Sequence, residues 1–256
     1  MTSLWLWLSL GLFLALLVCL ELGYRVGKGH IATHETDEGK SPNLLSGIVY
    51  GLLSLLLSFS FAIAMQRFDA RRRIVVDEGN AVGTAYLRLD LLPTVEQPPF
   101  RKEFRRYADT RLDYTKALDN GLDTEEFTKA TASQQKLIWT MLMAEYQRDP
   151  RDSTRIQLTP AINAMFDVAA TRDESVKTRV PLVIYLLLGG VSLASALMAG
   201  RNLAARPTRE WGQRILFSGV LAAVMFVIAD LDSPRQGYIR VDTADQILKD
   251  VRSSMQ

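Results

Sequence analysis

Four long apolar runs, separated by charged segments, limit the folds open to this chain. They cover approximately residues 4–22, 43–65, 181–200 and 215–229, and Glu21 is the only charged side chain within them. A helix that crosses the hydrocarbon core of a bilayer, about 30 Å thick, needs about 20 apolar residues. The first three runs have this length, and the fourth reaches it when Trp211 and Leu231 at its ends are included. We therefore expect four transmembrane helices surrounded by a lipid bilayer.

Two of the runs have alternative interpretations. The first could be a secretory signal peptide, but such peptides have basic residues before a shorter apolar core and small residues at a cleavage site. Residues 1–3 carry no basic side chain and no site of the Ala-x-Ala type follows, so we expect a retained transmembrane helix. The fourth run is short enough to be a buried helix of a soluble domain, and this alternative stays open for that run.

The average composition conceals the four runs. Apolar residues make up 48% of the 256-residue chain and charged residues 23%, with a net charge of +2, which resembles a soluble protein. The near-neutral balance removes the argument for a strongly basic nucleic-acid-binding protein, so no nucleic acid is expected as a partner. The single cysteine, Cys19, cannot form an intramolecular disulfide.

Four spans place both termini and the long segment between the second and third runs on one side of the membrane. Basic residues near the span ends favour the cytoplasm for that side, most clearly Arg67 and residues 71–73 directly after the second run. The expected domains are residues 1–65 with two spans, 66–180 as a cytoplasmic domain, 181–231 with two further spans, and 232–256 as a cytoplasmic tail.

The segment 66–180 is expected to be helical, because its apolar residues repeat every 3.6 positions and no strand pattern competes. A first helix continues from residue 68 to about 92, and Pro93, Pro98 and Pro99 then predict a break. Further helices are expected at about 100–118, 123–146 and 160–179, with the last one able to continue into the third span. The predicted fold is therefore all-α: a four-span helical membrane protein with a helical cytoplasmic domain between spans 2 and 3.

Small residues recur every three or four positions along one face of the second run, beginning at Gly47. Each glycine inside a helix costs about 1 kcal/mol relative to alanine, so repeated glycines predict a close approach to the backbone. One interpretation is tight packing against another helix. The other is a pore wall, in which serine hydroxyls replace part of an ion's hydration and a large apolar side chain forms the constriction. The residues assigned to this wall are Gly51, Ser54, Ser58, Phe61 and Met65.

A similar face of small residues in the third run, Ser192, Ala196 and Gly200, favours packing as the general explanation. Both interpretations therefore stay open for the second run.

Polar residues and a further pair of glycines continue on the helix beyond the second run. Ion pairs on such a face contribute only about 0 to 1 kcal/mol when exposed, but they fix the register of helices when buried between subunits. A solvated helix face is the alternative. The expected contacts between subunits are at Arg73, Asp77, Asn80, Gly83 and Arg88.

Acidic residues at the span ends have structural interpretations. Glu21 can pair with Arg25, four residues later on the same helix. Asp230 and Asp232 follow the fourth run and are expected to cap the end of that segment rather than to form an acidic ring at a pore mouth.

No pattern of catalytic or metal-binding residues stands out. His30 and His34 are four residues apart, but glycines around them predict a solvated loop rather than a metal site. The sequence has no phosphate-binding glycine loop, no nucleophile elbow and no zinc-protease pair. We therefore expect neither a metal nor a cofactor, and no enzymatic activity.

Two sequence blocks resemble the bestrophin-like membrane-protein family of bacteria and plants. The first is Glu-Gly-Asn-Ala-Val-Gly-Thr-Ala-Tyr-Leu-Arg at residues 78–88, followed by Leu-Leu-Pro at 91–93. The second is Asp-Leu-Asp-Ser-Pro-Arg-Gln-Gly-Tyr-Ile-Arg-Val at residues 230–241. With the four runs, these blocks cover most of the chain. Gly79 stands where alanine is expected in this family.

The resemblance implies a plan similar to that of bestrophins, which are pentameric anion channels with four spans, cytoplasmic termini and a second helix that lines the pore. It implies a homo-oligomer, with a pentamer favoured, in a bacterial inner membrane. The second run lacks the proline-and-aromatic neck pattern of bestrophins, so constriction residues, anion selectivity and calcium gating are not carried over.

We therefore expect a passive ion channel whose second span lies nearest the axis, with ions and other copies of the chain as partners. The alternative is a membrane-anchored scaffold or sensor whose cytoplasmic helices bind a partner without conduction.

Overall fold

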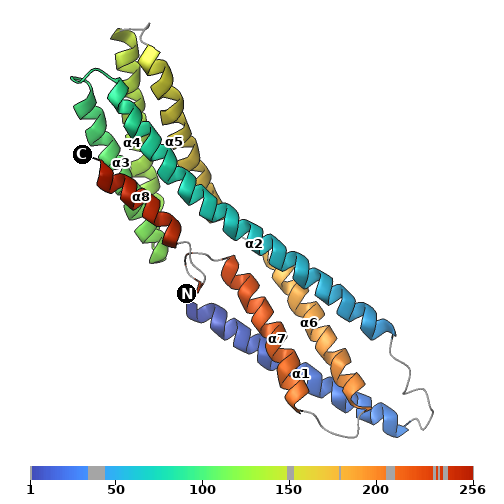
Figure 1. Ribbon diagram of the computed structural model, residues 1–256. Helices are drawn as coiled ribbons and strands as arrows, with labels where there is room; N and C mark the ends of the chain where they lie inside the picture. The colour runs from blue at the N-terminus through green and yellow to red at the C-terminus, as the bar shows by residue number, and fades with distance from the viewer. Residues whose placement is uncertain are drawn as a thin grey trace. The chain divides into compact units, whose positions relative to one another are not determined.

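The computed structural model describes residues 2–33, 44–148, 153–178, 180–205, 211–232, 235, 237–238 and 242–255. All regular structure in these residues is helical, which confirms the expected all-α fold (Figure 1). The helices are α1 (Thr2–Thr33), α2 (Leu44–Leu87), the 3-10 helix η2 (Arg88–Leu91), α3 (Gln97–Asp119), α4 (Glu125–Arg148), α5 (Ser153–Lys177), α6 (Leu182–Leu203), α7 (Trp211–Leu231) and α8 (Asp242–Ser254).

Four of these helices are long and apolar enough to cross a membrane, as expected from the four runs. They are α1, α2, α6 and α7. The fourth run is part of a helix of 21 residues, which begins at Trp211 and ends at Leu231. At a rise of about 1.5 Å per residue, this helix reaches about 30 Å and can span the hydrocarbon core.

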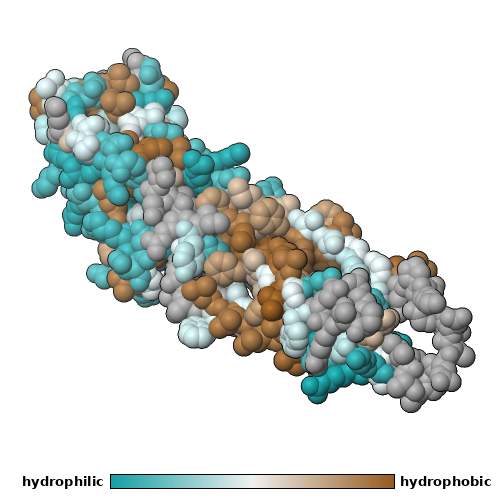
Figure 2. Space-filling view, turned by 60° about the horizontal axis from the view of Figure 1, so that its bottom comes forward, coloured by the Kyte–Doolittle hydropathy of each residue, from teal (hydrophilic) through white to brown (hydrophobic). Residues whose placement is uncertain are grey.

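The chain divides into two compact units. The first comprises residues 1–67 and 180–233 and contains α1, the apolar part of α2, α6 and α7. Here α1 packs against both α6 and α7. The core contains Leu16, Leu20, Leu53, Ala196 and Leu221. Other large apolar side chains remain exposed and form the brown, hydrophobic surface visible in Figure 2.

Glycines allow α1 and α6 to cross with their backbones in contact. A Cβ atom added at Gly23 would lie 2.0 Å from the carbonyl oxygen of Leu197, and one at Gly200 would lie 2.0 Å from that of Leu20. No side chain fits at such distances, so only glycine permits this crossing. The small face of the third run therefore serves tight packing between membrane helices.

The second unit comprises residues 68–179 and 234–256. It contains the rest of α2 with η2, α3, α4, α5 and α8, and α3 packs against both α4 and α8. Its core includes Val82, Leu89, Phe104, Ile138 and Leu248, all at most 2% exposed. Polar side chains cover much of this part of the chain, which appears teal in Figure 2.

Turn and capping residues define the ends of α3 and α4. Pro98 and Pro99 lie in the first turn of α3, where a missing N–H is tolerated, so they start this helix rather than only interrupting the chain. Gly121 has φ of 67°, which favours glycine, and it follows the last residues of α3 in the turn-forming sequence Asp-Asn-Gly at residues 119–121. The Asp123 carboxylate accepts a 3.0 Å hydrogen bond from the Glu125 amide at the start of α4.

Two predictions for the later helices were wrong. The helix expected from residue 160 begins at Ser153, with Pro160 inside it, because the proline removes only one hydrogen bond of a helix held by buried neighbours such as Leu158 and Ile162. This helix also ends at Lys177 and does not continue into the third span, whose helix begins at Leu182 after Pro181. In addition, the tail expected at residues 232–256 contains α8, a helix that the sequence analysis did not predict.

Candidate functional site: the second membrane helix

The helix α2 is 44 residues long, about 66 Å at the usual rise, and this is more than twice the thickness of a hydrocarbon core. Its apolar part extends to Met65, and its polar part begins with Gln66 and Arg67. The predicted boundary between a membrane domain and a cytoplasmic domain therefore lies inside one continuous helix. The candidate conduction residues lie in the apolar part.

Two faces of this apolar part have clear surroundings. Ser46, Leu53 and Ala64 are at most 4% exposed and fall on one face at about 100° per residue. Large side chains occupy the opposite side and are 48 to 60% exposed. They are Ile48, Leu52, Leu55, Phe59 and Ile63. Such side chains suit contact with lipid.

The stripe of small residues forms a third face, about a quarter of a turn from the buried one. Gly47 and Gly51 are exposed, and a Cβ atom added at either glycine would meet nothing within 4 Å. Ser54 and Ser58 are exposed as well. Close packing against another helix of the same chain, which explains Gly200, is therefore not found for this stripe within the described residues.

The two serines of this face use their hydroxyl hydrogens within the helix. Ser54 Oγ donates a 2.9 Å hydrogen bond to the Tyr50 carbonyl, and Ser58 Oγ donates a 2.8 Å hydrogen bond to the Ser54 carbonyl. Neither hydroxyl needs a neighbouring helix to satisfy it. Each oxygen still has a lone pair that can face water or an ion.

Phe61 and Met65 follow the serines on the same face and are 43% and 40% exposed. The face therefore changes from small and polar to large and apolar toward the polar part of α2. An apolar ring of this kind can gate a water-filled path by dewetting when copies surround an axis. The five residues predicted as a pore wall thus share one uncovered face, and their place in a pore stays a prediction.

Some of the predicted subunit contacts beyond residue 65 are exposed, and others contact helices of the same chain. Arg73, Asp77 and Asn80 are exposed. Arg88 donates a 2.7 Å hydrogen bond from Nη1 to the Gln157 carbonyl of α5. A Cβ atom at Gly83 would lie 3.2 Å from the Val251 side chain of α8. The last two positions therefore make contacts within the chain, whereas the first three remain accessible.

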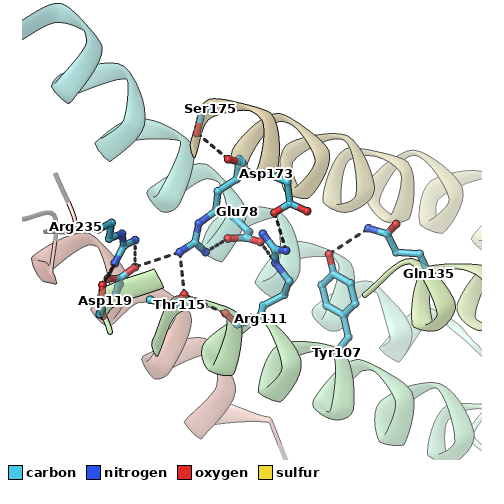
Figure 3. Close-up of polar contacts among 11 residues, drawn as sticks. Glu78, Tyr107, Arg111, Thr115, Asp119, Gln135, Asp173, Ser175 and Arg235 are labelled. Atoms are coloured by element: carbon cyan, nitrogen blue, oxygen red, sulfur yellow. Dashed lines mark hydrogen bonds and ion pairs between the residues drawn. The ribbon is translucent and has the colours of Figure 1, made fainter. Parts of the chain in front are cut away.

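A buried charge cluster surrounds Glu78, which is 0% exposed in the polar part of α2 (Figure 3). Its Oε1 lies 2.5 Å from Nε of Arg111 in α3, and its Oε2 accepts a hydrogen bond from Nη1 of Arg172 in α5. Arg111 also pairs with Asp173 at 3.0 Å. Arg172 donates a 2.8 Å hydrogen bond to Thr115 Oγ1. One carboxylate of α2 therefore joins two guanidiniums from two other helices.

The cluster extends to the C-terminal helix. Arg172 Nη2 lies 3.5 Å from Asp245 of α8. Asp245 also receives two hydrogen bonds from Arg235, whose Nη1 lies 3.0 Å from Asp119 at the end of α3. Buried ion pairs of this kind fix how helices align, because losing one partner leaves an uncompensated charge. The cluster therefore sets the alignment of α2, α3, α5 and α8.

The cluster perturbs the acidity of its members. Burial acts to raise the pKa of Glu78, but the adjacent Arg172 and Arg111 guanidiniums outweigh it and hold that pKa below its usual value. Burial and the nearby Asp173 raise the pKa of Tyr114 to about 12, and the Arg111 guanidinium lies 4.4 Å from the Tyr114 ring. Glu78 therefore stays ionised at neutral pH and Tyr114 stays protonated.

Comparison with known proteins identifies the family. The bestrophin-like domain matches residues 11–246 of the chain. The chain belongs to the bestrophin-like family. The resemblance of residues 78–93 and 230–241 is thereby confirmed, and the protein is a multi-pass membrane protein whose family is not one of enzymes.

Solved structures show the same fold for the bestrophin-like chain. A crystal structure of a bacterial bestrophin homologue from Klebsiella pneumoniae, phased with zinc, is 14% identical and has a TM-score of 0.66, covering 94% of this chain and 98% of that one. A single-residue variant of the same homologue is also 14% identical, with a TM-score of 0.68 and the same coverage. At this identity, the likeness concerns the fold. Comparison with curated proteins finds no match in sequence.

Gly79 lies against the C-terminal helix in this bestrophin-like protein. A Cβ atom at Gly79 would lie 2.7 Å from Cγ2 of Ile247 and 3.2 Å from the Leu248 amide nitrogen. Helix α8 therefore packs directly on α2 at this position. A methyl group at this position would therefore require the Ile247 side chain to shift.

The acidic residues at the span ends are structural in this chain. Glu21 pairs with Arg25 at 2.9 Å, as expected, and also with Arg214 at 2.6 Å. Asp232 is 7% exposed and accepts a 3.1 Å hydrogen bond from the Val180 amide and a longer one, 3.4 Å, from the Tyr185 hydroxyl. Asp232 therefore contacts the start of α6, and its expected role at the end of its own segment stays a prediction.

Sequence reasoning missed the charge cluster. Arg172 precedes the third run in the sequence, but it is 2% exposed and bound to Glu78. Arg214, directly before the fourth run, is also 2% exposed. A usable signal was Arg111, which lies on the same helix face as the buried aromatic residues Phe104 and Tyr107. An arginine on such a face predicts a buried carboxylate partner.

Proposed function

We propose that this bestrophin-like protein assembles as a homo-oligomer and conducts ions passively along an axis lined by α2. The observation that carries this proposal is the uncovered small face of α2, which is separate from the face suited to lipid. A surface of glycines and serines offers lipid few contacts, but it lets identical helices approach an axis closely.

The order of residues along this face supports a conduction path. Ser54 and Ser58 would supply oxygen atoms to a hydrated lumen, and Phe61 and Met65 would form its apolar constriction. Gly51 would keep the path wide at the level before the serines. The oligomer number follows from family resemblance, which favours a pentamer.

The proposed setting is a bacterial inner membrane with both termini and residues 66–180 in the cytoplasm. Arg72 and Arg73 support this orientation, because both are exposed directly after the apolar part of α2. Arg172 does not contribute to this argument, since its charge is paired in the buried cluster.

A second candidate is a membrane-anchored scaffold or sensor that binds a partner through the second unit. The observation in its favour is the exposure of Leu137 and Trp139 on α4, 42% and 36% respectively. Aromatic residues on a surface are common at sites of protein association. A scaffold would need no oligomer and no conductance.

Conductance of the purified protein in planar bilayers tests the proposal. We expect Ser54→Trp to abolish the current, because it fills the face assigned to the axis. The matched control is Leu55→Trp on the face assigned to lipid, which should conduct as the unchanged protein does. Absence of conductance in every salt, together with a monomer by mass, would overturn the channel. A current that Ser54→Trp leaves unchanged would exclude this face as the pore wall.

A further inference from the structure

A cavity of about 320 Å³ lies within the first unit. Its lining comes from all four membrane helices and combines polar and apolar side chains. The residues that line the cavity include Leu20, Tyr50, Asn202, Gln213, Arg214 and Phe217. The volume lies within the range of small-ligand sites and far exceeds the space that a few water molecules need.

Arg214 is the charged residue of this cavity, and it is 2% exposed. Its Nη1 donates a 2.6 Å hydrogen bond to Glu21, and its guanidinium lies 4.3 Å from the Tyr24 ring and 5.3 Å from the Trp211 ring. Its Nε is buried and has no hydrogen-bond partner among the described residues. A buried N–H of a guanidinium without an acceptor is unfavourable, so this atom requires an acceptor from outside the described chain.

The charge around the cavity is positive among the described residues. Glu21 is shared between Arg214 and Arg25, and the Lys28 ammonium lies 5.2 Å from the Tyr24 ring on the same helix. Two arginines therefore share one carboxylate, and Lys28 adds a third cation on α1. The missing acceptor is accordingly expected to carry a negative charge.

The rest of the lining separates polar from apolar contacts. Asn202 donates to the Tyr50 hydroxyl at 3.5 Å, and both side chains remain able to bind a polar group. Leu20 and Phe217 supply apolar surface. The cavity lies near the last residue of α6, Leu203, and near the beginning of α7, where membrane helices meet the headgroup layer. This combination fits a ligand with an anionic head and an apolar tail.

We propose that this cavity binds an acidic phospholipid, with a phosphate oxygen accepting the hydrogen bond of Arg214 Nε. The head would lie among Tyr50, Asn202 and Gln213, and the first part of an acyl chain would cover Leu20 and Phe217. A free phosphate offers the same oxygen atoms but leaves the apolar lining uncovered. The proposal does not depend on conduction.

Titration of the delipidated full-length protein in detergent tests this site. The probes are dioleoylphosphatidylglycerol, dioleoylphosphatidylcholine and inorganic phosphate, followed by thermal unfolding and by native mass spectrometry. We expect only phosphatidylglycerol to raise the unfolding temperature and to remain bound. An equal effect of inorganic phosphate would show a site for free anions, and an equal effect of phosphatidylcholine would show binding without charge recognition. Either result would overturn the proposal.

Two variants and one control test whether the lipid binds in this cavity. Ala199→Phe fills the cavity from its lining without changing any charge, and Ala194→Phe on the exposed side of the same helix is its matched control. Arg214→Lys keeps a charge for Glu21 but removes the Nε donor. We expect the affinity for phosphatidylglycerol to fall about tenfold or more in Ala199→Phe and in Arg214→Lys. The affinity should remain unchanged in the control, Ala194→Phe. Unchanged affinity in folded Ala199→Phe would place the lipid elsewhere and refute the assignment.

Discussion

Glu78 of α2 and Arg111 of α3 form an ion pair from which solvent is completely excluded, since both side chains are 0% exposed. Arg172 binds the other oxygen of the same carboxylate. A buried ion pair contributes modestly as a whole, but removing one member leaves charge buried without compensation. Replacing one residue of this cluster should therefore lower the stability of the folded protein, and the free energy of unfolding measures this effect.

Glu78→Gln is expected to destabilise the protein by about 3–5 kcal/mol, because two buried guanidiniums lose their shared negative charge. Thermal unfolding in detergent measures the change. Asp77→Asn is the control, since it makes the same chemical change at the adjacent, exposed position and should alter stability by less than about 0.5 kcal/mol. Similar unfolding temperatures for the two variants would contradict the role given to the cluster.

The lowered pKa of Glu78 predicts loss of stability in acid. Its carboxylate has a pKa below the usual value of 4.5 in the folded protein, so ionisation favours folding. This contribution is fully present above the unfolded pKa and is lost as the pH falls through the lower, folded pKa. Unfolding temperatures measured from pH 6 downward should therefore decline less steeply for Glu78→Gln than for the unchanged protein. Parallel profiles would show that Glu78 does not contribute.

Gly200 and Gly51 should respond differently to the same substitution. Gly200→Leu places a side chain against the α1 backbone at the Leu20 carbonyl, and we expect a loss of more than about 3 kcal/mol or no folded protein. A Cβ atom added at Gly51 meets nothing within 4 Å, so a folded Gly51→Leu protein is expected, with conductance lowered by the narrower path. Yield and unfolding temperature in detergent separate the two outcomes. Equal damage from both substitutions would show that the α2 stripe is also closely packed.

Phe61→Ala is expected to raise conductance, because a smaller side chain widens the proposed apolar constriction and eases wetting. Phe59→Ala removes the same ring from the face suited to lipid and serves as the control. Single-channel currents in planar bilayers measure the effect. If Phe59→Ala raises the current and Phe61→Ala does not, the helix has a different orientation relative to the axis.

Much of the fold could be predicted because its signals are local. The length of the apolar runs predicts the four transmembrane helices. The 3.6-residue period of apolar residues predicts the buried helix face that contains Val82 and Leu89. Capping by Asp123 and the turn at Gly121 also follow from residues close together in the chain.

The features that were missed depend on contacts distant in sequence. Arg172 binds Glu78 across 94 residues, and nothing near either residue identifies its partner. Helix α8 packs against Gly79 through Ile247, so only the folded chain shows what the glycine accommodates. For the candidate site, the spacing of Ser54 and Ser58 predicts one shared face. Its place at a pore axis depends on other copies of the chain.

The hydrogen bonds of Ser54 and Ser58 to their own helix bear on how the lining of a conduction path could differ among related proteins. Because no other helix among the described residues of this chain bonds these hydroxyls, replacing either serine changes the chemistry presented at this face while the described contacts within the chain stay the same. The lining of such a path can vary among relatives independently of the architecture that supports it. Substitutions at these two positions should therefore alter permeation properties without reducing the yield of folded protein.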